Sequence, residues 1–140
     1  MIVCKFGGTS VASAEQIQKV ANIVKSNPAR KIVAVSAPGK RSGDDIKVTD
    51  LLIDLANAAL QNENIEEKLQ TVVNRYKSIA DGLQLDHTIC DVITEDLRER
   101  VQGDPSNEEL FIDSLKAAGE DNNAKLIAAY FNSIGMPARM

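Results

Sequence analysis

The 140-residue sequence has no tryptophan, one histidine and two cysteines, and aromatic residues make up only 4% of it. A structural zinc site needs about four soft ligands, and His87, Cys4 and Cys90 alone do not provide them. The two cysteines lie far apart in the sequence and form no Cys-x-x-Cys pair, so we expect reduced, buried thiols. The sequence therefore predicts neither a zinc site nor a disulfide.

An excess of positive charge and long apolar runs are also missing. The net charge is -4, and the lysines and arginines are scattered, whereas a nucleic-acid-binding face needs them clustered. No apolar run approaches the roughly 20 residues of a membrane helix, and the chain does not start with a signal-peptide pattern. We therefore expect a cytoplasmic protein without a nucleic-acid or membrane partner.

Acidic residues are frequent but do not predict a metal site. Asp44, Asp45 and Asp50 lie close together in sequence. Their spacing does not match the alternating acids, glycine and final glutamate of an EF-hand loop. We interpret these three residues as surface and helix-capping acids, and we predict no metal ligands among the side chains.

The start of the chain has the pattern of a strand, a tight turn and a helix. Residues 2–6 form a mostly apolar run that ends at the glycine pair 7–8, as expected for a buried strand entering a turn. Apolar residues then recur at helical spacing over about 11–26, where Thr9 or Ser10 is the expected N-cap.

A second β-rich run follows at 31–37 and is closed by Pro38-Gly39. Strand, helix and strand at this spacing predict a βαβ unit with two parallel, neighbouring strands. From Lys47 onward the pattern is helical. Its apolar stripes span 51–60, 65–79 and 89–101, followed by a helix capped by Ser106 and interrupted at Gly119, and by a last helix from about 122 to 133.

Two parallel strands are too few for this number of helices, because a parallel sheet is normally built from several crossovers that cover both of its faces. Residues 136–140 have the pattern of a lead-in to a third strand. We therefore expect residues 1–140 to be the N-terminal portion of a larger domain.

The segment Lys5 to Val11 carries the clearest chemical signal. Glycines allow a sharp turn with exposed backbone N–H groups, and the helix that follows adds the positive end of its dipole, an arrangement suited to phosphate. Lys5 places a mobile positive charge at the carboxyl end of the strand, where ligands of α/β sheets bind. The alternative is a plain strand–helix turn beside a solvent-exposed lysine, since a glycine pair alone is a weak signal.

The sequence Lys-Phe-Gly-Gly-Thr-Ser-Val at 5–11 resembles the opening motif of aspartate kinases, a branch of the amino acid kinase family. Val-Ser-Ala at 35–37, with Val-Thr-Asp-Leu-Leu at 48–52, resembles the second motif of that branch, and Ala-Gly-Glu at 118–120 resembles the third. The resemblance implies an α/β fold, a three-layer α/β/α sandwich of the amino acid kinase (carbamate kinase-like) type. Residues 1–140 would be its N-terminal part only, without the rest of the kinase domain and the regulatory ACT domains.

The resemblance implies transfer of the γ-phosphoryl group of ATP, with Mg²⁺, to the side-chain carboxylate of L-aspartate, the first step of lysine, threonine and methionine biosynthesis. The nucleotide loops and the arginine for the aspartate α-carboxylate are expected later in the family's chain, so residues 1–140 alone are expected to be inactive. We expect the full-length protein to be a homo-oligomer.

Carried over residue by residue, the resemblance makes Lys5 the catalytic group that bridges the aspartate carboxylate and the γ-phosphate. Gly7, Gly8, Thr9 and Ser10 would hold phosphate oxygens through backbone and hydroxyl donors.

Three more residues are implied in binding, each with an alternative. Ser36 would contact the phosphoryl group or the reacting carboxylate, or would simply end a strand. Thr49 would hold aspartate, or would be a helix N-cap. Glu120 would match the aspartate ammonium group, or would be a solvated surface charge.

Two other functions stay open from the sequence. One is an amino acid kinase that acts on a different carboxylate or on carbamate. The other is a non-catalytic binding or assembly module that keeps the phosphate turn.

Overall fold

The structure is a computed structural model that describes all 140 residues. Two parallel strands, β1 (Ile2–Phe6) and β2 (Arg30–Val35), form the sheet and are joined by helix α1 (Ala14–Lys25). Lys5 lies opposite Ala34, and Phe6 opposite Val35. The predicted βαβ unit is confirmed. Strand β2 begins one residue earlier than the expected start at 31 and ends two residues earlier than the expected end at 37.

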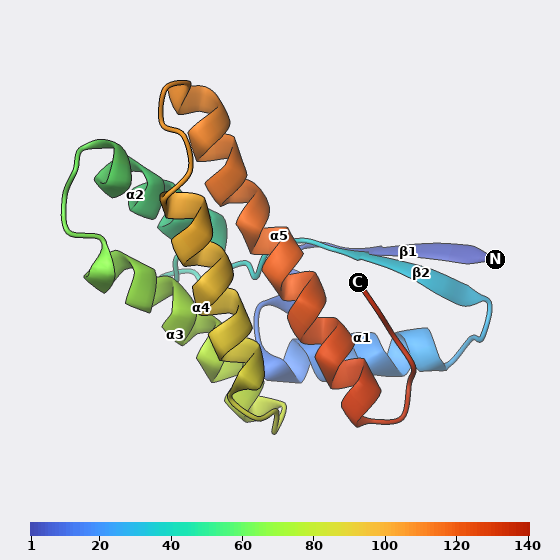
Figure 1. Cartoon of the computed structure of the whole chain (residues 1–140). Helices are drawn as coiled ribbons and strands as arrows, with labels where there is room; N and C mark the ends of the chain where they lie inside the picture. Colours follow the sequence, from blue (N-terminus) through green and yellow to red (C-terminus); the bar gives the residue numbers. More distant parts are fainter.

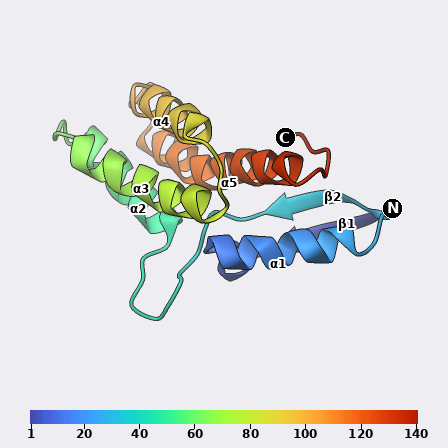
Figure 2. The same ribbon diagram turned by 90° about the horizontal axis from the view of Figure 1, so that it is seen from below.

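Helices cover both faces of the sheet. Figure 2 shows α1 on one face and the long helix α5 (Glu108–Ser133) on the other. The apolar stripe of α1 is buried, as the periodicity predicted, and consists of Ile17, Val20, Ala21 and Val24. The three-layer α/β/α arrangement expected from the sequence is therefore confirmed.

Three further helices lie beyond the carboxyl ends of the strands (Figure 1); the first and the third pack against α5, and the second packs against both of these. They are α2 (Val48–Leu60), α3 (Glu66–Gly82) and α4 (Thr88–Val101). Most of the apolar core lies here. Its fully buried side chains include Leu52, Leu55, Leu69, Tyr76, Ile93, Leu97, Leu115 and Leu126.

The turn after β1 differs from the expected one. Residues Gly8–Val11 form a short 3-10 helix, η1, so α1 begins only at Ala14. Its N-cap is Ser13, whose Oγ accepts a hydrogen bond from the backbone N–H of Gln16 at 3.3 Å. The prediction of Thr9 or Ser10 as the cap was wrong, because both residues belong to the 3-10 turn.

Helix α5 was wrongly predicted as two helices. It is capped by Asn107, whose Oδ1 accepts from the N–H of Leu110 at 3.1 Å, rather than by Ser106. It then continues through Gly119 without a break. A Cβ at Gly119 would lie 2.7 Å from the Ala37 Cβ and 3.2 Å from the Leu52 Cδ1, so this glycine permits close packing instead of ending a helix.

The remaining expectations concern the cysteines and the end of the chain. Cys4 is half-buried, Cys90 is buried, and both are free thiols. Residues 136–140 form no strand; the backbone N–H and C=O of Ala138 bond to the Asn132 side chain at 2.9 and 2.8 Å. None of the helices combines the length and the apolar composition that crossing a membrane demands.

Candidate functional site

The carboxyl ends of β1 and β2 carry the first group of predicted site residues. Lys5 is the penultimate residue of β1, and its side chain is exposed. Gly7 leads into η1, and its carbonyl accepts from the N–H of Ser10 at 3.1 Å. No atom lies within 4 Å of the point where a Gly7 Cβ would stand, so the turn is open to solvent on that side. Thr9 and Ser10 are likewise exposed.

Two glycines hold the loops after the strands in direct contact. The Gly39 N–H donates to the Gly8 carbonyl at 2.9 Å. A Cβ at Gly39 would lie 2.7 Å from the Gly8 carbonyl carbon and 3.0 Å from the Thr9 nitrogen. Side-chain rotation cannot relieve a clash with backbone, so only glycine fits at position 39. Pro38-Gly39 was predicted only to close a strand, and no signal in the sequence pointed to this contact.

Ser36 lies just after β2 and is held from both sides. Its N–H donates to the Phe6 carbonyl at 3.1 Å, which extends the strand pairing by one residue. Its carbonyl accepts from the Asn123 Nδ2 at 2.8 Å. Asn123 belongs to α5 and is fully buried, and its Oδ1 has no hydrogen-bond partner within the chain. No role was predicted for Asn123; the available signal was a polar residue among the apolar positions of this helix.

The third motif reaches the same edge of the sheet through α5. Gly119 packs on Ala37, and Glu120 follows it on the exposed side of the helix. The structure thus brings the segments 5–11, 35–37 and 118–120 to the carboxyl end of the sheet, although they are far apart in sequence.

Thr49 is the second residue of α2 and is half-buried. The N-cap of this helix is Lys47, and no side chain caps it. The alternative of Thr49 as an N-cap is therefore wrong. The N–H of Val48 donates to the Pro38 carbonyl at 3.0 Å, so the start of α2 is attached to the segment that follows Ser36.

A charged cluster that the sequence did not predict lies beside these loops. The Asp45 carboxylate accepts from the Arg41 Nε at 2.6 Å, the Arg41 Nη2 at 2.9 Å and the Arg41 backbone N–H at 2.8 Å. These hydrogen bonds hold the pKa of Asp45 well below its usual range. Asp45 was wrongly interpreted as a surface acid, since its side chain is only 12% exposed.

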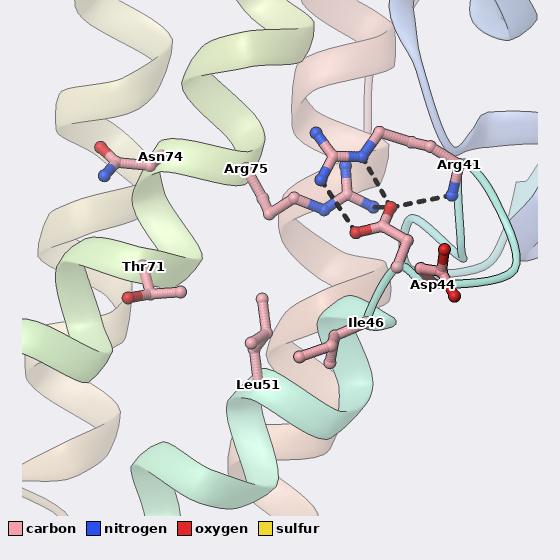
Figure 3. Close-up of a pocket in the computed structure, with 8 residues that line it drawn as sticks. Arg41, Asp44, Ile46, Leu51, Thr71, Asn74 and Arg75 are labelled. Carbon is pink, nitrogen blue, oxygen red and sulfur yellow. Dashed lines mark hydrogen bonds and ion pairs between the residues drawn. The ribbon is translucent and has the colours of Figure 1, made fainter.

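The cluster borders an open pocket of about 390 Å³ between the loop 41–46, α2 and α3. Figure 3 shows Arg41 and Arg75 on the same side of this pocket, with Leu51 and Thr71 further along it. Asp44 also lines the pocket and is exposed. No three of the His, Cys, Asp and Glu side chains are placed to hold a metal ion together.

A buried tyrosine connects α3 to the third motif. The Tyr76 hydroxyl donates to the Gly119 carbonyl at 2.7 Å, and the residue is only 1% exposed. Burial raises the pKa of Tyr76 well above its ordinary value. The phenol therefore stays protonated and serves as a hydrogen-bond donor that fixes α5 against α3.

Parallel strands alternating with helices define an α/β protein, a class whose ligands bind at the carboxyl ends of the strands. The sequence model of the amino acid kinase family matches residues 1–140. The chain belongs to the amino acid kinase family, which confirms the family and the fold inferred from the three motifs.

Its relatives include aspartokinase 3 of Bacillus subtilis, to which it is 53% identical over 138 residues, covering 99% of this chain and 30% of that protein. The crystal structure of Clostridium acetobutylicum aspartate kinase is similar with a TM-score of 0.84 and 31% identity, over 94% of this chain and 29% of that one. Escherichia coli aspartokinase III in complex with aspartate and ADP gives a TM-score of 0.71 and 26% identity, over 96% and 29%. The chain thus spans about 30% of the length of these proteins.

Proposed function

We propose that residues 1–140 are the N-terminal portion of the catalytic domain of an aspartate kinase, which phosphorylates the side-chain carboxylate of L-aspartate with ATP. The observation that carries the proposal is the meeting of the segments 5–11, 35–37 and 118–120 at the carboxyl end of the sheet. Further support comes from the 53% identity to a protein named aspartokinase. A related structure was solved in complex with aspartate and ADP.

In this proposal an oxygen of the aspartate side chain attacks the γ-phosphorus and ADP leaves. A carboxylate needs no base to become a nucleophile, so catalysis consists mainly of positioning and of neutralising charge. Lys5, exposed at the end of β1, bridges the attacking carboxylate and the moving phosphoryl group. The backbone N–H groups around Gly7 and Gly8, with the hydroxyls of Thr9 and Ser10, hold phosphate oxygens.

The substrate side of the site is proposed to come from β2, α2 and α5. Ser36 contacts the phosphoryl group or the reacting carboxylate, Thr49 holds aspartate, and Glu120 pairs with its ammonium group. The residues around the turn provide N–H donors and a cation, which suit phosphate, and no carboxylate cluster suits a metal. Mg²⁺ would therefore arrive with ATP, and when bound it would neutralise phosphate charge.

We propose further that residues 1–140 alone do not catalyse the reaction, because the chain spans only about 30% of the length of the relatives. The test is a chimera in which residues 1–140 replace the matched 138-residue segment of Bacillus subtilis aspartokinase 3. Aspartyl-hydroxamate formation from aspartate, ATP, Mg²⁺ and hydroxylamine is measured for the chimera, for residues 1–140 and for the Bacillus remainder alone.

We expect product from the chimera only. A folded chimera that phosphorylates a different carboxylate would keep the family but contradict the substrate. A chimera that is folded and turns over no carboxylate would contradict the proposed function, and activity of residues 1–140 alone would contradict the claim that they are insufficient.

A further inference from the structure

Arg75 is a buried cation in a part of the chain where the sequence shows no functional motif. It lies on α3, and only 6% of the residue is exposed. Its Nη1 donates to the Ala12 carbonyl at 3.2 Å, and its Nη2 donates to the Gly39 carbonyl at 2.6 Å. One guanidinium thus binds the backbone of both loops that follow the strands.

The two carbonyls that Arg75 binds belong to the two loops that follow β1 and β2. Ala12 ends the turn that begins at Gly7, and Gly39 begins the loop that leads to α2. The same two loops touch again where Gly39 contacts Gly8. The loops are therefore joined directly through glycine backbone and indirectly through Arg75, which anchors both of them to α3.

Burial makes this arrangement costly, and the surroundings offset the cost only in part. Burial, followed by the charge of Arg41, lowers the pKa of Arg75, while Asp45 opposes this effect. The Asp45 Oδ2 lies 3.7 Å from the Arg75 Nη2 and is itself held by Arg41 (Figure 3). The Arg75 Nε has no partner within the chain. Apolar residues often replace buried charges without loss of stability, so stability alone does not account for an arginine here.

We propose that Arg75 is a positioning residue that fixes the phosphate turn after β1 and the loop after β2 relative to each other, with Asp45 as its counter-ion. The proposal rests on the proposed function, because these are the loops assigned to the phosphoryl group and to aspartate. Arg75 acts through the backbone at Ala12 and Gly39 and does not touch the substrates.

Holding two loops at once requires the planar guanidinium group of arginine. Its two terminal nitrogens reach two carbonyls at a fixed separation, whereas lysine is a single point donor. Arg75→Lys keeps the charge but holds at most one of the two loops firmly. A misplacement of about 1 Å in catalytic geometry lowers a rate by roughly 100-fold.

The first experiment measures amide hydrogen exchange in the 140-residue chain, without any substrate. Arg75→Lys and Arg75→Met are compared with Arg98→Met, which removes an exposed arginine paired with Glu66. We expect exchange at the amides of Ser10 and Gly39 to become at least tenfold faster in both Arg75 variants, with the amides of α4 unchanged. Arg98→Met should leave the loop amides unchanged.

An unchanged rate at Ser10 and Gly39, or an equal increase at every amide, would overturn the proposal. If Arg75→Met does not fold, Arg75→Lys decides. Asp45→Asn supplies a second test, because it keeps both hydrogen bonds of Arg75 and removes its counter-ion. It should accelerate exchange at the same amides by a smaller factor.

The second experiment measures kinetics in the chimera. Arg75→Lys should lower kcat about 10- to 100-fold, while its midpoint of unfolding stays near that of the parent. The Arg98→Met control should keep a kcat near that of the parent. An unchanged kcat in a chimera that is active would overturn the positioning role. If the parent chimera is inactive, the proposed function fails, and the exchange experiment still decides whether Arg75 fixes the loops.

Discussion

The helical half of the chain and its two-stranded sheet bury their apolar side chains to very different extents. Leu52, Leu115 and Leu126 in the helices are fully buried. In the strands, Val3 is 64% exposed and Ile32 is 48% exposed. An open groove of about 1200 Å³ also runs along β2 and the last turns of α5.

This contrast separates the source of stability from the location of the site. Burial of apolar surface is the main favourable term in folding, so α2 to α5 supply most of it. The candidate site lies at the seam between the two regions, where Gly39 contacts the backbone of Gly8 and where Gly119 of α5 packs against the Ala37 side chain. Changes in the helical core should therefore alter mainly stability, whereas changes at the seam should also alter activity.

The largest effect on stability is expected from Leu115→Ala in the helical core. Leu115 is fully buried, and its truncation should lower the free energy of unfolding by about 2–5 kcal/mol. Ile32→Ala in the exposed sheet should change it by no more than about 0.5 kcal/mol. Urea unfolding of the 140-residue chain measures both. Equal losses of unfolding free energy in the two variants would show that the helices and the sheet contribute equally to stability, which would contradict the contrast between them.

At the seam, Gly39→Ala is expected to lower activity. The new Cβ would lie 2.7 Å from the Gly8 carbonyl carbon, so the two loops must move apart. We expect kcat in the chimera to fall about 100-fold. Gly43→Ala is the matched control in the same loop, since no atom lies within 4 Å of its Cβ position. A Gly39→Ala chimera with the parent's kcat would show that the glycine contact does not position the site.

Gly119→Ala tests the close packing of α5 against the Ala37 side chain. Alanine favours a helix over glycine by about 1 kcal/mol, but its Cβ would lie 2.7 Å from the Ala37 Cβ. Overpacking of this kind costs about 1–3 kcal/mol. We expect a net loss of stability in thermal unfolding together with a raised KM for aspartate, because Glu120 moves with the helix. A stabilised variant would mean that the helix tolerates the methyl group and that close packing is unimportant here.

The smallest effect is expected from Tyr76→Phe. It removes the hydroxyl that donates to the Gly119 carbonyl at 2.7 Å and leaves the ring in place. A buried hydrogen bond of this type contributes about 1 kcal/mol. Chemical denaturation should show that loss, and the absorbance of the parent should show no tyrosinate from Tyr76 in the native state at high pH. Titration of Tyr76 near its ordinary pKa would contradict its burial.

The sequence predicted those parts of the fold that depend on local pattern. The βαβ unit followed from the two apolar runs and the turn residues after them, and the approximate extents of α3 and α4 followed from apolar periodicity. Gly119 was misread because a glycine in a helix signals either a break or a close contact, and only the position of Ala37 distinguishes them. Ser106 and Asn107 are both good caps, so the choice between them depended on how the chain enters α5.

The sequence motifs identified candidate site residues, but they did not predict how these residues are arranged in space. The site residues that stood out by resemblance, whose roles remain proposals, are Lys5, Gly7, Gly8, Thr9, Ser10, Ser36, Thr49 and Glu120. Asn123 and Arg75 were missed, because their partners are backbone carbonyls far away in the sequence. A hydrogen bond to a carbonyl places no constraint on the type of the partner residue and so leaves no pattern along the chain.

The most direct test of the central claim is the effect of Lys5→Ala on phosphoryl transfer in the chimera, with Lys31→Ala as the control. Both lysines lie in exposed strand positions, Lys5 at the carboxyl end of β1 and Lys31 near the start of β2. Loss of a charge that stabilises the transition state should lower kcat by about 100- to 1000-fold, while Lys31→Ala keeps the parent's rate. Equal rates for the two variants would contradict the placement of the site at the carboxyl end of the sheet.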